Sequence, residues 1–554
     1  MVINRKPQTM SGFFKSNGRF GRTGWLLAAV LLLPAASAWA GDPPAPASSH
    51  PYSTDTNNPP IWLAGDPLTG PLSRRNCFDL ALSRNLDLRI VRLQADMAGD
   101  MLSGAYGVYS PNFTFDAKHA YETDLGDYDP RKFNPYFTDQ NTVDEMGADL
   151  SGKVPFGFSY DFSSDLTKIQ TFTDFRSDPE DATNFPGGIR STNDHDAVVD
   201  LKMKQHLLKD FWIDADREVL LARGANLKIS QQELRLQIMT TLLSVELAYD
   251  DLIATREEVR VQEKTLELRR QFVADTHRRI ELGGATPLDE TQAEIQLQNT
   301  LTRLATARQA FSASQNNLIS LLTDDFKSWT GENLQLTDTL QSAPVSINRS
   351  DSFQSALSQR PDLIQARLAV EKSAAVVEFR LNQIFPSLDL VGDYGGQGSE
   401  NHFGGPALGD AFAFRNPQYS YGVVVSFPLD NASARGDYRA SKAAKQIAEL
   451  QLKKAEQAVL LQVADLVSSI DFCFSQVESS HLARTYAESA LETETKKYQD
   501  GIATSLEVIL FQETLTNARS AEIRAQEDYN KALAQLAFAD GTILEKNGLS
   551  LQVK

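Results

Sequence analysis

The chain has 554 residues, a formal net charge of -18 at neutral pH and only two cysteines. An excess of acidic side chains argues against nucleic acid as a partner, and two cysteines exclude a disulfide-rich scaffold. A chain of this length can contain several structural units.

Residues 1–40 are typical of a secretion signal, with an apolar run at 25–33 and a small-x-small sequence, Ala38-Trp39-Ala40, before Gly41. Its removal takes the net charge from -18 to -23, because the signal carries five cations and no carboxylate. Residues 41–77 form a Pro-rich arm that we expect to be extended. No later run of eighteen apolar residues is found, so crossing a membrane would require strands.

The first repeat spans 78–322 and opens with a helix that ends at Pro111. Alternating stretches of strand type follow between 112 and 208. One starts at Phe113, one runs from 149 to 162, one starts near Val198, and 166–175 is a weaker candidate. Charged side chains on one face and apolar ones on the other predict a barrel with a wet lumen, and a soluble sheet is the alternative.

A long helix is predicted at 214–282, because apolar residues recur at a spacing of seven, which is typical of a coiled coil. The row consists of Ile238, Val245, Leu252, Val259, Leu266, Val273 and Ile280. At 1.5 Å per residue the helix is about 100 Å long. A Gly-Gly stop and the sequence Thr286-Pro287 then begin a return helix at 287–322, which completes a hairpin.

After a polar connector at 323–352, the same order of elements is repeated in a second repeat at 353–541. Phe78 matches Phe353 and Pro111 matches Pro386 at a constant offset of 275. The elements of this repeat are strands at 387–429, a long helix at 435–498 and a return helix at 504–540, with a tail at 542–554. Cys473 falls on the apolar row of the long helix and is predicted to be a buried thiol.

One strand pair from each repeat gives at least four strands per chain, which cannot close a barrel. Their open edges must pair with other copies of the chain. We therefore expect an obligate homo-oligomer with an open axis.

These features together resemble the TolC family of outer-membrane efflux proteins. The motifs that carry the resemblance are the duplicated Ala-Leu helix openings, the proline before each first strand, Gln205-His206-Leu207, Phe427-Pro428-Leu429 and the Gly-x-Ala-Thr tips. The resemblance implies an α+β membrane protein with long antiparallel coiled-coil hairpins and a transmembrane antiparallel β-barrel shared between protomers. It also implies a homotrimer in the outer membrane of a Gram-negative bacterium, extending into the periplasm, with a membrane-fusion adaptor and an inner-membrane pump as partners.

The chain departs from the family pattern at two places. About 80 residues separate Phe113 from His195, which favours an added hairpin in the barrel over extra strands outside the membrane. His206 stands where the family often has proline. The number of strands per protomer, four or six, is left open by the sequence.

No motif for catalysis, no metal site and no cofactor site is found. Seven scattered histidines and seven unclustered methionines do not indicate a copper or silver exporter. The candidate functional residues are therefore those of an entrance. Asp289 and Glu507 occupy matched positions after the two tips, and by resemblance they are expected to form acidic rings at the periplasmic gate. Their alternative role is to stabilise helix N-termini.

The resemblance also places Tyr498 near Asp289, as a hydrogen bond that holds the tunnel closed. The tips Gly283, Thr286, Gly501 and Thr504 are expected to contact the adaptor, with plain helix capping as the alternative. The function indicated is a passive exit duct for efflux or type I secretion. A trimeric surface stalk or adhesin and a periplasmic helical scaffold are the competing interpretations.

Overall fold

The structure is a computed structural model that describes residues 72–125, 138–174, 189–325, 334–341, 343–401 and 404–549. They all belong to one compact unit, Gly65–Val553. The predicted signal and residues 41–71 of the arm lie outside the described residues. The helices are α1 (Arg74–Arg84), α2 (Leu86–Ala105), the 3-10 helix η3 (Tyr106–Tyr109), α3 (Ala215–Glu281), α4 (Pro287–Leu322), α5 (Arg349–Gln359), α6 (Pro361–Asn382), α7 (Gly404–Phe412), α8 (Ala432–Gln499), α9 (Ser505–Ala539) and α10 (Ile543–Lys546).

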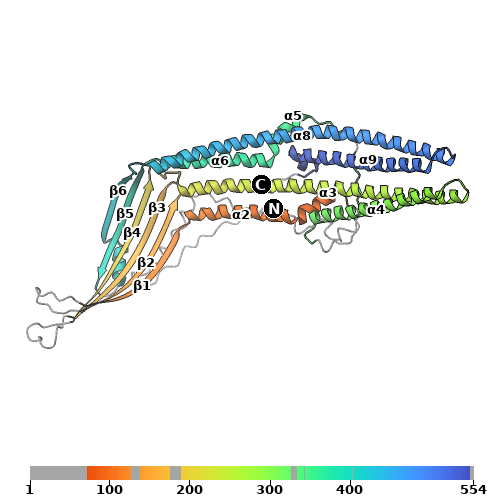
Figure 1. Ribbon diagram of the computed structural model, residues 1–554. Helices are drawn as coiled ribbons and strands as arrows, with labels where there is room; N and C mark the ends of the chain where they lie inside the picture. Colours follow the sequence, from red (N-terminus) through yellow and green to blue (C-terminus); the bar gives the residue numbers. More distant parts are fainter. Residues whose placement is uncertain are drawn as a thin grey trace, which may run out of the picture. The chain divides into compact units, whose positions relative to one another are not determined.

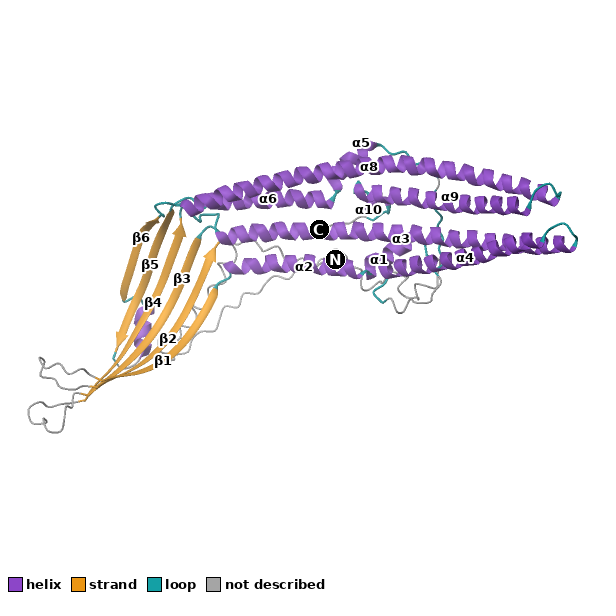
Figure 2. Ribbon diagram, in the orientation of Figure 1, coloured by secondary structure: helices purple, strands orange, loops and turns teal. Residues whose placement is uncertain are grey.

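The strands form one antiparallel sheet in the order β1-β2-β3-β4-β5-β6. They are β1 (Asn112–Leu125), β2 (Thr138–Val154), β3 (Phe158–Asp174), β4 (Ile189–His206), β5 (Ser387–Glu400) and β6 (Asn416–Ser426). The first repeat contributes four strands and the second contributes two, so the described sheet contains the added hairpin (Figure 2). Strands β1 and β6 are its two open edges.

The predicted single strand from 149 to 162 is wrong, because this stretch is a hairpin between β2 and β3. The turn at 155–157 is closed by a hydrogen bond from the Gly157 amide to the Val154 carbonyl at 3.1 Å. Gly157 has a φ of +78°, which favours glycine. Pro155 and Gly157 were the turn signals in the sequence. The apolar alternation continues through the turn, and this concealed the break.

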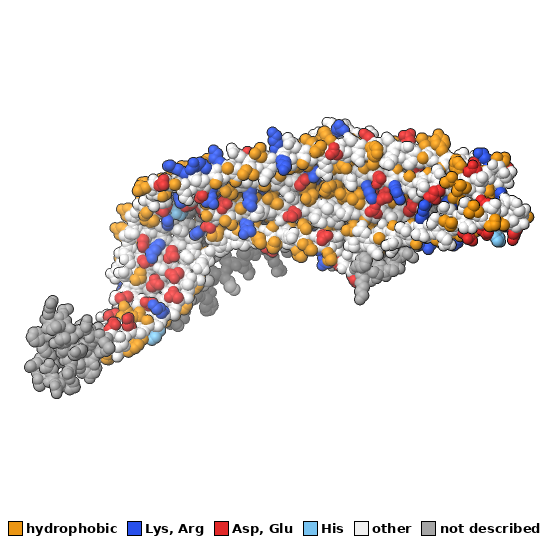
Figure 3. Space-filling model, viewed as in Figure 1, with side chains coloured by type: hydrophobic (Ala, Val, Ile, Leu, Met, Phe, Trp, Pro, Cys, Tyr) orange, Lys and Arg blue, Asp and Glu red, His pale blue; other side chains and the backbone are white. Residues whose placement is uncertain are grey.

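Cross-strand partners share a face of a sheet, and the register therefore defines two unlike faces. Asp161, Lys202 and Asp393 pair in one row of the charged face. Leu201, Tyr394 and Tyr419 pair in one row of the apolar face. The charged face is visible in Figure 3 as acidic and basic side chains over the strands. Exposed apolar side chains on the other face include Phe113 (68%), Tyr419 (73%) and Tyr421 (83%).

The long helices form two antiparallel hairpins, α3 with α4 and α8 with α9 (Figure 1). Asp214 begins α3 by accepting a hydrogen bond from the Arg217 amide at 2.7 Å. In the second hairpin, Val463 and Ile470 pack with Tyr529 in an apolar core. Cys473 lies in the same core, as predicted, and it and Cys77 are both free thiols.

The helix predicted ahead of each first strand is broken once in each repeat. Asn85 separates α1 from α2 with an extended ψ of 128° and caps α2, accepting a hydrogen bond from the Leu88 amide at 3.2 Å. Arg360, at the matched position, separates α5 from α6 with a ψ of 123° and precedes Pro361. An extended residue before proline is sterically favoured.

Two further features differ from the sequence-based expectation. The segment predicted as strands at 387–429 is interrupted by the helix α7. One helix in the described part of the chain, α8, also contains a stretch long and apolar enough to cross a membrane by composition alone. Because α8 packs against α5, α6 and α9 along its length, this stretch belongs to the coiled coil.

Candidate functional site

The two hairpin tips are built from the same backbone turn. Gly283 and Gly501 have φ values of +76° and +78°. The Gly284 amide donates to the Arg279 carbonyl at 2.8 Å, and the Ile502 amide donates to the Lys497 carbonyl at 2.9 Å. This is the Schellman arrangement that ends helices. An added Cβ would meet nothing within 4 Å at either glycine, so backbone conformation and not space favours glycine here.

The return helices both begin with a capping box. The Asp289 carboxylate accepts from the Thr286 amide at 2.8 Å, and the Thr286 hydroxyl accepts from the Asp289 amide at 3.3 Å. Glu507 and Thr504 make the same pair of bonds at 2.7 and 3.4 Å. Each cap therefore satisfies two backbone groups at a helix N-terminus. The capping alternative for these carboxylates is thus present in the structure.

Both capping carboxylates are held in the ionised form. The pKa of Asp289 is lowered mainly by the hydrogen bond from the Ser505 hydroxyl and further by Thr286. The pKa of Glu507 is lowered mainly by the Thr504 backbone amide. A hydrogen bond to the charged form favours that form. At neutral pH, each tip therefore presents a fixed negative charge.

Several contacts join the first hairpin to the second at this end. The Ser505 hydroxyl donates to the free oxygen of Asp289. Arg279 donates to the Tyr498 carbonyl at 2.8 Å and lies over the Tyr498 ring at 4.0 Å. The Tyr498 ring also packs on Phe272 with ring centres 5.6 Å apart.

The expected hydrogen bond between Tyr498 and Asp289 is wrong for this structure. The Tyr498 hydroxyl is buried without a hydrogen-bond partner among the described residues, and the cross-hairpin partner of Asp289 is Ser505. Tyr498 belongs to an apolar cluster with Phe272 and Val508, so its ring and its backbone carbonyl make the contacts. The resemblance correctly placed Tyr498 at the contact between the hairpins, but it assigned the wrong hydrogen-bond partner to Asp289.

The tips also carry exposed apolar side chains that the sequence analysis did not single out. They are Leu282 (80%), Leu288 (65%), Ile502 (77%) and Leu506 (50%). Leu288 and Leu506 stand at matched positions of the two repeats, each directly before the capping acid. This match was the feature of the sequence that could have identified them. These four side chains lie together at the end of the molecule where the two hairpins turn.

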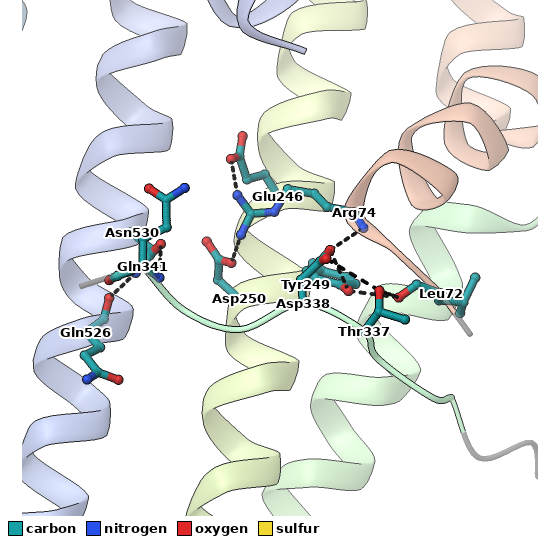
Figure 4. A network of polar contacts seen from close by, with 10 residues as sticks. All are labelled: Leu72, Arg74, Glu246, Tyr249, Asp250, Thr337, Asp338, Gln341, Gln526 and Asn530. Atoms are coloured by element: carbon teal, nitrogen blue, oxygen red, sulfur yellow. Dashed lines mark hydrogen bonds and ion pairs between the residues drawn. The ribbon is translucent and has the colours of Figure 1, made fainter. Parts of the chain in front are cut away.

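A polar cluster that we name the connector network lies where the connector crosses the helices (Figure 4). Arg74 at the start of α1 reaches two carboxylates of α3, Glu246 at 3.0 Å and Asp250 at 2.7 Å. The Asp250 side chain is fully buried. Burial, opposed by Arg74, raises the pKa of Asp250 to about 7, and burial also raises the pKa of Glu246.

The connector itself is held on both sides of this network. The Arg74 amide donates to Asp338 at 2.8 Å, and the Tyr249 hydroxyl donates to the Leu72 carbonyl at 2.9 Å. On the other side, Asn530 of α9 accepts from the Gln341 amide at 3.1 Å and donates to its carbonyl at 3.0 Å. The connector thus links α1, α3 and α9 (Figure 4). The sequence analysis missed these residues because their partners are 89 or more positions away.

Among the residues that the structure describes, no group of three or more His, Cys, Asp and Glu side chains is placed to hold a metal ion. The candidate site is therefore composed of the two tips and the contacts between them. It offers fixed negative charge, a contact between the two hairpins and an exposed apolar rim.

Comparison with known proteins agrees with this architecture. A family model described as outer membrane efflux protein matches residues 353–542. The chain is 24% identical over 346 residues to the pyoverdine export outer membrane protein OpmQ of Pseudomonas aeruginosa, which covers 61% of this chain and 69% of that protein. It is 22% identical over 360 residues to the outer membrane efflux protein BepC of Brucella suis, covering 64% and 74%.

Solved structures show the same fold. The outer membrane protein VceC of Vibrio cholerae has a TM-score of 0.59 at 19% identity, over 84% of this chain and 96% of that one. The outer membrane channel CmeC of Campylobacter jejuni has a TM-score of 0.59 at 14% identity, over 87% of each chain. The predicted resemblance and the predicted fold class are confirmed. Residues 353–542 therefore match the outer membrane efflux protein family, and the chain has the fold of TolC-like outer membrane channels.

Proposed function

We propose that three copies of this chain form one passive exit duct across the outer membrane and the periplasm. The observation that carries the proposal is the six-stranded sheet with one charged and one exposed apolar face, joined directly to two long hairpins. Six strands with open edges at β1 and β6 need partners. Closure by three copies produces a lumen lined by the charged face, with the apolar face toward lipid.

The helical part supports the same assembly. Exposed apolar side chains lie along α2 and α8. Helix α2 precedes the edge strand β1, and α8 follows the edge strand β6. On α2 they are Leu86, Ile90, Leu93, Met97 and Met101, and on α8 they are Ile447, Leu450, Leu461, Phe472, Leu482 and Tyr486. Unpaired rows of this kind at both edges favour association with further copies of the chain.

The duct supplies no energy in this proposal, because the candidate site offers charge and contact surface but no catalytic group. A periplasmic membrane-fusion adaptor and an inner-membrane pump are the proposed partners, and the apolar tip residues are the proposed contact surface. Asp289 and Glu507 are proposed to act both as helix caps and as a negatively charged ring at the entrance. Repeated three times, such carboxylates attract cations and repel anions.

The decisive experiment is electrical. The purified protein is extracted in detergent, its mass is determined, and it is inserted into a planar bilayer. We expect a trimer with small cation-selective currents that become several-fold larger in the Asp289→Ala, Glu507→Ala double variant. A water-soluble or non-conducting protein would instead support the periplasmic scaffold or the surface stalk. A conducting trimer with unchanged currents in the double variant would remove the gate role and leave the duct.

A further inference from the structure

Helix α7, which follows β5 in the chain, packs flat against strands β4 and β5 of the sheet. Ala407 and Ala411 of α7 are fully buried, and they contact Ala197 and Val199 of β4, which are 1% exposed. Phe162 of β3 completes this contact. Figure 2 shows the short helix behind the strands. The helix is therefore packed against the sheet and is not a free loop.

Two glycines of β5 make room for the helix. A Cβ on Gly396 would collide with the carbonyl oxygen of Ala411, and a Cβ on Gly398 would collide with that of Ala407. Backbone atoms cannot move aside as a flexible side chain does, so this close approach requires residues without a side chain. The seat is specific for a helix lying across β5.

The register shows which face α7 covers. Gly396 pairs with Val199 and Gly398 pairs with Ala197, and these residues share the apolar face with Tyr394. Asp200 and Lys202 alternate with them and point to the charged face. The charged face is the one toward the viewer in Figure 3, and α7 lies behind it.

The apolar face has a defined outer limit. His119, Asp144, Lys168, His195 and Glu400 pair in one row that crosses five strands and lies farther from the long helices than the row of Ala197 and Gly398. Lys168 and His119 both bind Asp144, at 3.3 and 2.6 Å. A row of charges on the otherwise apolar face is expected where the hydrocarbon layer ends.

An aromatic group marks the inner limit of the same face. Phe156 and Trp212 have ring centres 6.5 Å apart, and Phe211 lies 6.1 Å from Trp212. Arg217 lies over the Trp212 ring at 5.3 Å. Aromatic side chains of this kind gather at membrane interfaces. From Phe158 to Lys168, ten residues at about 3.3 Å rise and a tilt of about 40° span about 25 Å, the height of an outer-membrane apolar band.

We infer that α7 lies outside the barrel, buried among the acyl chains of the outer leaflet, just below the charged row. This inference rests on the proposed duct, because the charged face must line the lumen for the apolar face to meet lipid. The partner is the hydrocarbon of the outer leaflet, and α7 leaves the lumen free. The two charges of this segment, Asp410 and Arg415, pair with each other at 2.9 Å, and a long arginine side chain can extend toward the polar layer above.

The test uses nitroxide labels at three single-cysteine positions of the trimer in lipid bilayers. Gly409→Cys labels the side of α7 away from the sheet, where an added Cβ meets nothing within 4 Å. Phe115→Cys labels the bare apolar face at the same height, and Gln418→Cys labels the charged face. The native cysteines are buried. Collision with oxygen, which concentrates in lipid, and with a water-soluble nickel complex is measured for each label.

We expect the Gly409 and Phe115 labels to collide mainly with oxygen, and the Gln418 label mainly with the nickel complex. A Gly409 label that behaves like the Gln418 label would place α7 in the lumen and overturn the inference. Water access at Phe115 as well, together with a non-conducting protein, would mean instead that the proposed duct is wrong.

A second variant removes the seat of the helix. Gly398→Val should release α7 and make the Gly409 label mobile while the Phe115 label keeps its spectrum. Because α7 lies outside the lumen, the single-channel conductance of Gly398→Val should equal that of the parent. A changed conductance with an intact trimer would contradict the external position.

Discussion

The guanidinium of Arg279 lies 4.0 Å from the centre of the Tyr498 ring and donates a hydrogen bond to the Tyr498 carbonyl at 2.8 Å. This one side chain therefore ties the end of α3 to the end of α8 through both an aromatic face and a backbone acceptor. The tie lies beside the hydrogen bond between Ser505 and Asp289. Separating the two tips would require these two contacts, and the packing of Tyr498 on Phe272, to break.

Arg279→Ala should release one of the two ties. A cation over a tyrosine ring at a partly exposed site is worth about 0.5–1 kcal/mol, so the contact between the hairpins should weaken without unfolding either helix. We expect several-fold larger single-channel currents and an unchanged trimer mass. Arg279→Lys keeps the charge but loses the planar group, and it should give an intermediate value. Parental currents in Arg279→Ala would exclude a role in closure.

Ser505→Ala separates the two roles of Asp289. The variant removes the cross-hairpin hydrogen bond but leaves both Thr286 contacts of the capping box. We expect larger currents with a nearly parental melting temperature. Thr286→Ala is the matched control, because loss of a cap costs about 1 kcal/mol while Ser505 still reaches Asp289. If Ser505→Ala and Thr286→Ala change the currents equally, capping alone explains Asp289.

Asp250 should make the stability of the connector network depend on pH. Burial raises the pKa of Asp250 from 3.8 to about 7, so the folded protein keeps a proton that the unfolded chain releases near pH 4. This contribution to stability is complete below the unfolded value and is lost as the pH rises through about 7. Melting temperatures measured from pH 4 to 8 should fall less steeply in Asp250→Asn than in the parent.

The dependence of the melting temperature on pH should not disappear entirely in Asp250→Asn. Burial and the neighbouring Asp251 also raise the pKa of Glu527 to about 7, and Glu527 binds Lys531 at 2.6 Å. Asp250→Asn combined with Glu527→Gln should therefore flatten the profile further. Identical pH profiles for the parent and both variants would show that Asp250 is ionised in the folded protein.

The apolar rim of the tips should matter for the adaptor and not for conduction. Leu288→Gln with Leu506→Gln places uncharged polar groups on side chains that are 65% and 50% exposed, so folding should be unaffected and the charge of the entrance stays the same. We expect loss of adaptor binding in a pull-down and an unchanged conductance. Thr302→Gln changes the exposed surface of α4 away from the tip and should bind normally. Normal adaptor binding by the double leucine variant would exclude this rim.

The tip glycines should respond to backbone conformation and not to size. Gly501→Asn should be tolerated better than Gly501→Ala, because asparagine adopts a positive φ more readily than alanine does. A loss of about 1 kcal/mol is expected for Gly501→Ala, measured as a lower melting temperature. Equal melting temperatures for the two variants would contradict this explanation of the glycine.

Elements with a local pattern could be predicted from the amino-acid sequence. The apolar row from Ile238 to Ile280 specified a coiled coil, and Gly283 with Thr286 specified the end of one helix and the start of the next. These patterns are sufficient because helix periodicity and capping involve residues a few positions apart. The tip of the second hairpin then followed from that of the first, because Gly501 and Thr504 match Gly283 and Thr286 at an offset of 218.

Contacts between residues far apart in the chain depend on the fold and leave no local pattern in the sequence. The turn at Gly157 is hidden in the sequence by an apolar alternation that runs unchanged from β2 into β3. The partner of Asp289 is Ser505 and not Tyr498. Which side chain of the second hairpin contacts Asp289 depends on how the two hairpins pack together. Arg74 binds Asp250, which lies 176 positions away in the chain. Helix α7 packs on Gly396 and Gly398 because the register of the sheet places both glycines on the same face.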